Sequence, residues 1–284
     1  MRVRYSFSCR RTGHTENIVK QRQKVPEIAR QVICMSDVIL EVLDARFIDE
    51  TRIPELEQEI IKKDKRLIYV LNKSDLLDKS KIKEVKEKLE LGGIKPYVFV
   101  SCTNHKGKKD LKKWMGIEVK KLGKHEGVKK RVQIGIIGYP NTGKSSLINF
   151  LTCKGAARTS PKAGFTKGIQ KIKFTEDIVI LDTPGVIAEK EYSHLIKEKV
   201  AEHAKIGART WSEVKDPEFV VDKLIKQYPG MLEKHYNIDA KGNSEALIET
   251  LGKRKNWLIK GGEVDIDRTA RFILKEWQEG KIKF

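Results

Sequence analysis

Short, nearly continuous apolar runs alternate with amphipathic stretches over the first two thirds of the chain. The apolar runs cover residues 38–43, 67–71, 97–100, 132–137 and 178–181. Strands that are buried on both faces of a parallel sheet have this pattern, because neither face alternates with solvent. Helical spacing covers residues 53–63, 80–91 and 110–122, and a further helix, interrupted by Pro26, is expected at 19–35. The pattern predicts an α/β fold whose mostly parallel sheet carries helices on both faces.

Beyond the last apolar run only helical patterns remain. The clearest of them places apolar residues at helical spacing at Ile266, Ala270, Ile273 and Trp277. Asp265 stands where an N-cap is expected, and Gly280 stands where the helix should end. Such a stripe is typical of a helix packed on a core. We therefore expect a basic N-terminal arm at 1–24, an α/β domain at 25–190 and an α-helical domain at 191–284.

The charge of the chain is concentrated in a few segments. The sequence has 58 Lys and Arg against 39 Asp and Glu, a formal net charge of +19. Residues 1–24 carry seven basic and one acidic residue, residues 104–131 eleven and three, and residues 153–173 six and none. Such clusters favour contact with a polyanion such as RNA, because they displace counterions from its phosphates. A heat-adapted charged surface or a membrane surface stays possible on charge alone.

The sequence argues against a membrane or secreted protein. No apolar run approaches the roughly 20 residues of a membrane span, and no signal-peptide core follows the basic N-terminus. Its cysteines are scattered without any Cys-x-x-Cys pair or His partner at metal-ligand spacing, at positions Cys9, Cys34, Cys102 and Cys153. We expect a cytoplasmic protein with reduced thiols, without a zinc site and without a membrane partner.

A phosphate-binding pattern follows the apolar run at 132–137. Residues 138–145 read G-Y-P-N-T-G-K-S, which fits G-x-x-x-x-G-K-[ST], and an apolar helix is expected at 146–151. Strand, loop and helix are the context that the motif requires. Lys144 would reach the β- and γ-phosphates, and the Ser145 hydroxyl would ligate Mg²⁺. The other residues of this segment that are predicted to bind the nucleotide are Asn141, Thr142, Gly143 and Ser146.

A second loop of the same site follows the last apolar run, where residues 182–185 read D-T-P-G. Asp182 would hold Mg²⁺ directly or through water, and the Gly185 N–H would contact the γ-phosphate. Thr166, in the basic loop before the next strand, is the candidate that completes Mg²⁺ coordination. Thr159 competes for that role but lies farther from the strand.

A guanine-reading pattern, N-K-S-D, occupies residues 72–75 directly after an apolar run. The Asp75 carboxylate can accept hydrogen bonds from the N1–H and the exocyclic amine of guanine, whereas adenine presents a different edge. Asn72 and Lys73 would brace the loop and stack on the base, with Ser74 between them and Asp75. This motif favours GTP over ATP.

Ser101 and Cys102 stand where a second guanine loop is expected, with the Cys102 N–H facing the base O6. Along the chain the motifs therefore follow the order N-K-x-D, S-C, phosphate loop (P-loop), Thr166 as the candidate switch threonine, and D-T-P-G. This order resembles that of the circularly permuted GTPases. The chain is similar to the YlqF/RbgA ribosome-assembly family and its archaeal and eukaryotic relatives, and the resemblance includes Asp44-Ala45-Arg46, Gly13-His14 and residues 258–263.

The resemblance also bears on hydrolysis. Val186 stands where Ras-like GTPases carry a glutamine that orients the attacking water, so intrinsic turnover should be slow. His14 resembles an N-terminal histidine that assists catalysis in the family, although a surface histidine in a flexible arm explains it equally well. Asn141 matches the P-loop asparagine of potassium-stimulated GTPases. The predicted catalytic residues are Lys144, Thr166, Gly185 and His14.

The Asp44-Ala45-Arg46 segment departs from the family pattern, in which a proline usually follows the arginine. Phe47 occupies that position, and the first proline after it is Pro54. Its shared role is therefore open, and helix capping or packing is the expected role of Asp44.

The sequence predicts a Mg²⁺-dependent GTP hydrolase that acts on a ribosomal precursor particle through ribosomal RNA. The basic loop that contains Thr166, which would be the switch loop, would also carry Lys162, Lys167 and Lys171. The resemblance implies the large subunit, and the absence of a long heptad pattern favours a monomer. Two alternatives stay open: a nucleotide-regulated RNA-binding scaffold with incidental hydrolysis, and a GTPase acting on transfer RNA or another RNA.

Overall fold

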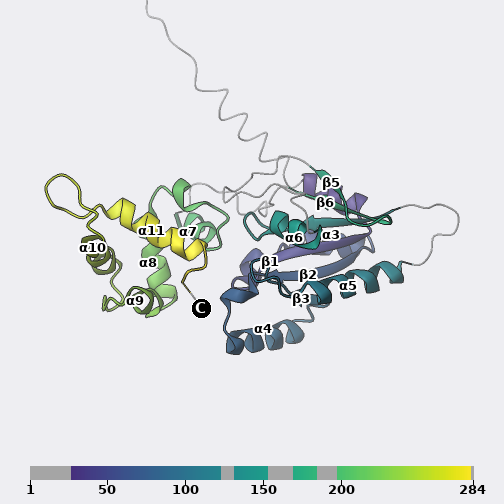
Figure 1. Cartoon of the computed structure of the whole chain (residues 1–284), viewed down its shortest axis with the longest axis horizontal. Coiled ribbons are helices and arrows are strands. Elements are labelled where there is room, and N and C mark those ends of the chain that lie inside the picture. Colours follow the sequence, from purple (N-terminus) through teal and green to yellow (C-terminus); the bar gives the residue numbers. More distant parts are fainter. Residues whose placement is uncertain (1–26, 123–130, 153–168, 184–196, 283–284) are drawn as a thin grey trace, which may run out of the picture.

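The computed structural model describes residues 27–122, 131–152, 169–183 and 197–282. Its centre is a six-stranded sheet in the order β3-β2-β1-β4-β6-β5 (Figure 1). The strands are β1 (Val38–Asp44), β2 (Arg66–Asn72), β3 (Tyr97–Phe99), β4 (Val132–Ile137), β5 (Gln170–Lys173) and β6 (Ile178–Asp182). Among these described strands, β5 runs antiparallel to β6 and the other pairs are parallel. This confirms the predicted mostly parallel sheet.

Helices cover both faces of the sheet. The first helix occupies residues 27–35. It is followed by α2 (Ile48–Thr51), α3 (Pro54–Lys62), α4 (Lys79–Leu91), α5 (Lys108–Lys121) and α6 (Lys144–Thr152). Leu40 and Val42 of β1 pack with apolar residues of α5 and α6, whereas Ile39 packs with the first helix and α3. Successive side chains of a strand point to opposite faces, so β1 is buried from both sides.

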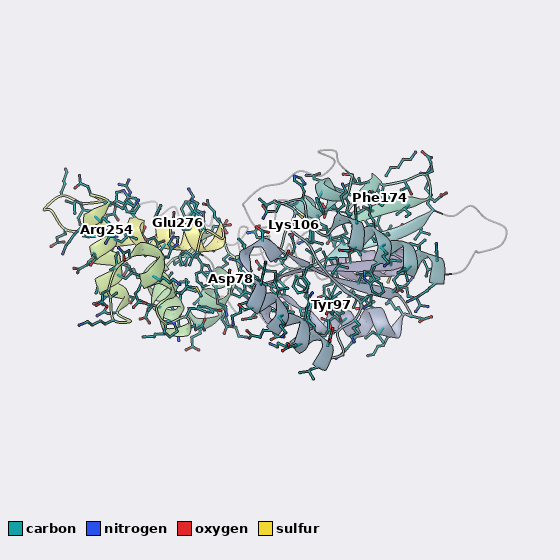
Figure 2. The ribbon with its side chains drawn as sticks, turned by 60° about the horizontal axis from the view of Figure 1, so that its bottom comes forward. Asp78, Tyr97, Lys106, Phe174, Arg254 and Glu276 are labelled. Carbon is teal, nitrogen blue, oxygen red and sulfur yellow. The ribbon has the colours of Figure 1, made fainter. Side chains whose placement is uncertain are left out.

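A helical part follows the sheet part in the chain and lies beside it in Figure 1. It consists of α7 (Lys197–Lys205), α8 (Pro217–Gln227), α9 (Met231–Tyr236), α10 (Ser244–Arg254) and α11 (Ile266–Gln278). Figure 2 places Arg254 and Glu276 in it, and both residues form hydrogen bonds with Tyr236. The Tyr236 hydroxyl donates to Glu276 Oε2 at 3.0 Å, and its carbonyl accepts from Arg254 at 2.6 Å.

The last helix follows its predicted pattern except at its first residue. Asp265 caps α11 by accepting the Arg268 N–H at 3.0 Å, and Ala270, Ile273 and Trp277 are fully buried. The expectation that Ile266 belongs to the core is wrong, because its side chain is 41% exposed. Val264, just before the helix, is buried instead, and its side chain packs on Gly252 of α10.

The two parts meet at the carboxyl end of β1. The Phe47 ring stacks on Trp277 at 6.2 Å between ring centroids, and the Lys205 ammonium pairs with Glu50 at 3.0 Å. The end of α11 also packs on the guanine-loop turn η1 (Ser74–Leu76), where a Cβ on Gly280 would lie 2.4 Å from Leu76. Within the described ranges, no helix combines the length and apolar character needed to cross a membrane.

Candidate nucleotide-binding site

The predicted motifs, far apart in the sequence, meet at one edge of the sheet. Asn72 ends β2, Asp182 ends β6 and the phosphate loop follows β4. Because these strands are parallel, their carboxyl ends lie side by side. A cavity of about 510 Å³ opens there. One wall of it is formed by Asn72, Lys73, Asp75, Cys102, Asn141, Gly143 and Ser146.

The phosphate loop packs tightly enough to require its glycine at position 143. Gly143 has φ +98°, and a Cβ there would lie 2.2 Å from the amide nitrogen of Asn72. That amide donates a hydrogen bond to the Thr142 carbonyl at 2.8 Å. The guanine loop and the phosphate loop are thus joined directly.

Lys144 lies inside the phosphate loop. Its ammonium donates to the carbonyls of Gly138 at 3.0 Å and Tyr139 at 2.7 Å. Burial lowers the pKa of Lys144 to about 8, and the nearby charge of Asp182 opposes this shift. A phosphate entering the loop would offer this amine full negative charges in place of two carbonyl dipoles.

Asp182 and Ser145 bring together oxygen atoms that could be metal ligands beside the phosphate loop. The Ser145 hydroxyl donates to Asp182 Oδ2 at 3.4 Å, and Asp182 is only 1% exposed. Burial raises the pKa of Asp182, against the charge of Lys144. Its Oδ1 has no hydrogen-bond partner among the described residues. A buried carboxylate oxygen without a donor, beside a hydroxyl, fits Mg²⁺, a hard cation that takes oxygen ligands.

Ser101 and Cys102, the predicted second guanine loop, follow the end of β3. Ser101 is buried, and its hydroxyl accepts the Asn104 N–H at 3.0 Å. Cys102 lines the cavity, where burial and the charge of Asp75 raise the pKa of its thiol to about 12. The thiol therefore stays protonated at neutral pH and is not a nucleophile. Of the other predicted site residues, His14, Thr166 and Gly185 lie outside the described residues.

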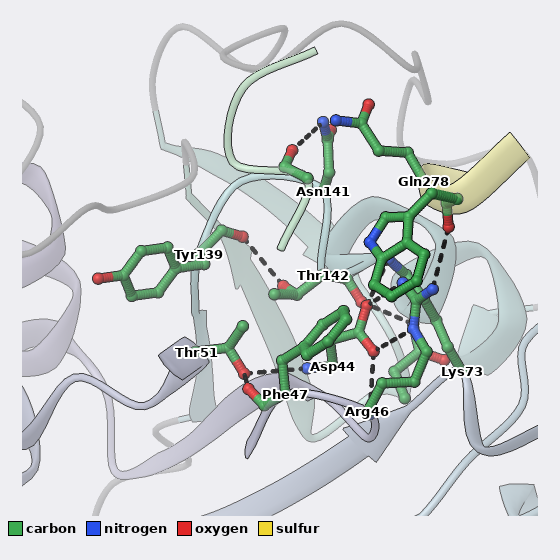
Figure 3. Close-up of polar contacts among 12 residues, drawn as sticks. Asp44, Arg46, Phe47, Thr51, Lys73, Tyr139, Asn141, Thr142 and Gln278 are labelled. Carbon is green, nitrogen blue, oxygen red and sulfur yellow. Dashed lines mark hydrogen bonds and ion pairs between the residues drawn. The ribbon is translucent and has the colours of Figure 1, made fainter. Parts of the chain in front are cut away.

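An ion-pair cluster around Asp44 borders the cavity (Figure 3). Arg46 contacts both oxygens of Asp44, at 3.0 Å from Nε and 2.8 Å from the terminal nitrogen, and Lys73 pairs with Oδ2 at 2.8 Å. Burial alone would raise the pKa of Asp44, but the charges of Lys73 and Arg46 hold it well below its usual range. The capping alternative for Asp44 is wrong, since Phe47 is the N-cap of α2 and makes no side-chain cap.

The same arginine reaches the helical part. A guanidinium nitrogen of Arg46 donates to the Trp277 carbonyl at 3.2 Å, and the guanidinium lies 4.9 Å from the centre of the Phe47 ring. Sequence reasoning did not predict these contacts. The spacing Asp-x-Arg could have indicated a local ion pair, but it contains no information on Lys73 or Trp277.

Comparison with known proteins gives the chain a family. Residues 133–250 match the family described as 50S ribosome-binding GTPase. Ribosome biogenesis GTPase A of Bacillus licheniformis is 31% identical over 270 residues, which cover 93% of this chain and 92% of that protein. The chain belongs to the YlqF/RbgA family of circularly permuted GTPases.

Other relatives extend the family to archaea and eukaryotes. An uncharacterized GTP-binding protein of Methanocaldococcus jannaschii is 38% identical over 272 residues, covering 94% of this chain and 68% of the relative. Nucleolar GTP-binding protein 2 of Yarrowia lipolytica is 32% identical over 89% of this chain but only 48% of its own length. The GNP-bound crystal structure of YlqF from T. maritima shares the fold, with a TM-score of 0.64, 23% identity and coverage of 92% of this chain and 95% of that one.

The permutation of the family is visible in the sheet. The guanine loop after β2 comes first in the chain and the phosphate loop after β4 comes later, yet β2 and β4 both pair with β1 in the sheet. The Asp44 cluster at the end of β1 is therefore flanked by both loops. It also lies where the helical part of this chain contacts the sheet part, through Arg46 and Trp277.

The Arg46 contacts lead to a stability prediction. Arg46→Met is expected to lower the free energy of unfolding by about 3 kcal/mol, because the buried Asp44 then keeps only Lys73 as an ionic partner. Denaturant unfolding measures the loss. Arg30→Met is the matched control: the Arg30 side chain is 46% exposed and 3.4 Å from Glu59, so its loss should stay below about 1 kcal/mol. Equal losses in the two variants would contradict a special role for Arg46.

Proposed function

We propose that this protein binds and hydrolyses GTP as a switch in the assembly of the large ribosomal subunit. The observation that carries the proposal is the meeting of the guanine loops and the phosphate loop around one cavity of about 510 Å³, with Ser145 of the phosphate loop in contact with Asp182 at the end of β6. The names of its relatives, Ribosome biogenesis GTPase A among them, support the biological setting.

Within this proposal each predicted residue has a role. Asp75 reads the guanine edge, supported by Asn72, Lys73, Ser74 and the loop of Ser101 and Cys102. The phosphates are wrapped by Asn141, Thr142, Gly143, Lys144, Ser145 and Ser146. Ser145 and Asp182 would hold Mg²⁺ together with Thr166, and the bound ion would neutralise charge on the β- and γ-phosphates. Gly185 would sense the γ-phosphate, and His14 and K⁺ at Asn141 would assist hydrolysis.

We infer that the macromolecular partner is ribosomal RNA. Helix α5 supports this inference, because its outer side carries exposed lysines at Lys109, Lys112, Lys113, Lys120 and Lys121. A row of lysines of this kind contacts phosphates without reading bases, so affinity should fall steeply with salt. The family description, 50S ribosome-binding GTPase, supports the large subunit as the site of action.

The remaining parts of the proposal follow from the sequence. We assign residues 1–24 to a basic arm, 25–190 to the circularly permuted GTPase domain and 191–284 to a helical RNA-binding domain. The protein acts as a cytoplasmic monomer.

The test of the proposed function is GTP turnover with and without precursor particles of the large subunit. We expect slow turnover by the free protein, because valine follows the D-T-P-G sequence, and stimulation of about tenfold or more on the particle. Lys144→Met should show neither the slow turnover of the free protein nor the stimulated turnover on the particle. Exchange of K⁺ for Na⁺ should reduce turnover if Asn141 places a potassium ion. Tight GTP binding without stimulation would contradict the switch and favour the scaffold alternative, in which hydrolysis is incidental.

A further inference from the structure

The nucleotide cavity has a second wall that no motif predicted. Opposite the guanine and phosphate loops, it is lined by residues of the helical part: Ile206, Gly207, Thr210, Trp211, Gln278 and Glu279. These residues come from the loop after α7, from the 3₁₀ turn η3 (Trp211–Glu213) and from the end of α11. The cavity therefore lies between the two parts of the molecule.

The Gln278 side chain makes three of the hydrogen bonds that hold this wall in place. The Gln278 amide donates to the carbonyls of Ala204 and Arg209, each at 2.8 Å, and its oxygen accepts the Trp211 N–H at 3.0 Å. The Trp211 carbonyl also accepts from Arg271 at 3.1 Å. The loop that carries Trp211 is thus fixed on α11 at both its beginning and its end.

The wall is also fixed to the sheet part. The side-chain amide of Asn141, in the phosphate loop, donates to the Gly207 carbonyl at 2.8 Å (Figure 3). On the other side of the cavity, Arg46 donates to the Trp277 carbonyl at 3.2 Å. These two hydrogen bonds fix the wall of the helical part to the sheet part.

The positions of the motifs determine which half of a nucleotide faces this wall. The phosphates belong at the phosphate loop and the guanine edge belongs at Asp75, so the ribose and one face of the base occupy the space between them. Trp211 lines that space with a half-buried indole ring. A flat aromatic surface suits the face of a purine or a sugar, because it contributes contact area without requiring a hydrogen bond.

We propose that Trp211 contacts the nucleoside half of the bound guanine nucleotide and that the helical part thereby closes the nucleotide pocket. The inference rests on the proposed function, since it concerns the same ligand. The contact is to the nucleoside, so GDP and GTP gain from it equally. Either nucleotide then holds the helical part against the sheet part.

Affinity for nucleotides tests the contact. Trp211→Ala should weaken GDP and GTP binding by the same factor, about tenfold, and Trp211→Phe should recover most of the affinity. Inorganic tripolyphosphate has no nucleoside and should bind the wild type and Trp211→Ala alike. The matched control is Trp257→Ala. The Trp257 ring packs on Phe272 at 4.9 Å between ring centroids, outside the cavity, so this variant should leave all of these affinities unchanged.

Intrinsic fluorescence gives a readout that a purely structural role of Trp211 would not change. GDP should alter the tryptophan emission of the wild type and of Trp257→Phe, and this change should disappear in Trp211→Phe. If Trp211→Ala fails to fold, the phenylalanine variant alone decides the question. A wild type that binds neither GDP nor GTP would overturn the proposed function. A wild type that binds both, together with Trp211 variants of unchanged affinity and unchanged emission response, would overturn this inference alone.

Discussion

Lys144→Met is expected to reduce the affinity for GTP and GDP by a factor between about 30 and about 5,000. The ammonium of Lys144 is buried in the phosphate loop, where it donates to the carbonyls of Gly138 and Tyr139. Methionine preserves the bulk of the side chain but removes its charge, and the loss of one partner from a buried, charge-assisted contact costs about 2–5 kcal/mol. Titration with a fluorescent GDP analogue measures the loss. Lys113→Met, which removes an exposed lysine of α5, is the matched control and should bind normally.

The pH dependence of binding separates the charge of Lys144 from its shape. Only the protonated amine attracts phosphates, and burial lowers its pKa to about 8 in the protein without nucleotide. Bound phosphates favour the charged form, so binding takes up a proton once the pH exceeds about 8. Wild-type affinity should therefore be constant from pH 6.5 to 7.5 and fall by up to about tenfold per pH unit above 8. The same slope in Lys144→Met would show that another group titrates.

The sequence was sufficient to predict the sheet and the position of the phosphate loop. Apolar runs of four to six residues between charged helices leave few alternatives to buried parallel strands, and β4 (Val132–Ile137) has the bounds that the pattern indicated. Once the strands are parallel, the residues that follow them must meet at one edge. This is why Asn72 and Asp182, which are far apart in the chain, could be assigned to one site before the structure was known.

The contacts between the two parts of the molecule could not be predicted in this way. Arg46 and Trp277 are separated by 231 positions, and their hydrogen bond depends on how α11 packs against the end of β1. A backbone carbonyl also has no distinctive sequence pattern. Trp211 was missed for a similar reason, because it lies in a 3₁₀ turn without any motif. The prediction that Ile266 belongs to the core failed for a different reason. Helical spacing identifies a face of the helix but not how far along that face the neighbouring elements extend.

A series of polar contacts runs from the guanine loop to the helical part. Lys73 of the guanine loop pairs with Asp44, Asp44 pairs with Arg46, and Arg46 donates to α11. The predicted guanine loop is thus connected to the helical part through the buried ion pair of Asp44 and Arg46. A change in the guanine loop should therefore be tested for its effect on base selection separately from its effect on folding.

Asp75→Asn is expected to change the base specificity of the pocket. Guanine presents two donors, N1–H and its exocyclic amine, to the Asp75 carboxylate, and asparagine replaces one of the accepting oxygens by an NH₂ donor. The lost charge-assisted bond and the opposed donors should cost about 3–4 kcal/mol, which corresponds to a loss of GTP affinity of about 10² to 10³. Xanthine has a carbonyl where guanine has its amine, and this carbonyl accepts from the new NH₂ group. The variant should therefore bind xanthosine triphosphate more tightly than GTP.

Competition of GTP and xanthosine triphosphate against a fluorescent nucleotide measures both effects. Asp78→Asn makes the same chemical change at the N-cap of α4, outside the residues that line the cavity, and should keep the wild-type preference for GTP. Thermal unfolding without nucleotide should be the same for both variants, because the described structure shows no hydrogen bond to either carboxylate that folding would lose. If Asp75→Asn loses affinity for both nucleotides in equal proportion, then Asp75 shapes the loop without reading the base. If it loses neither, the base lies elsewhere in the cavity and the assignment of the guanine loop is wrong.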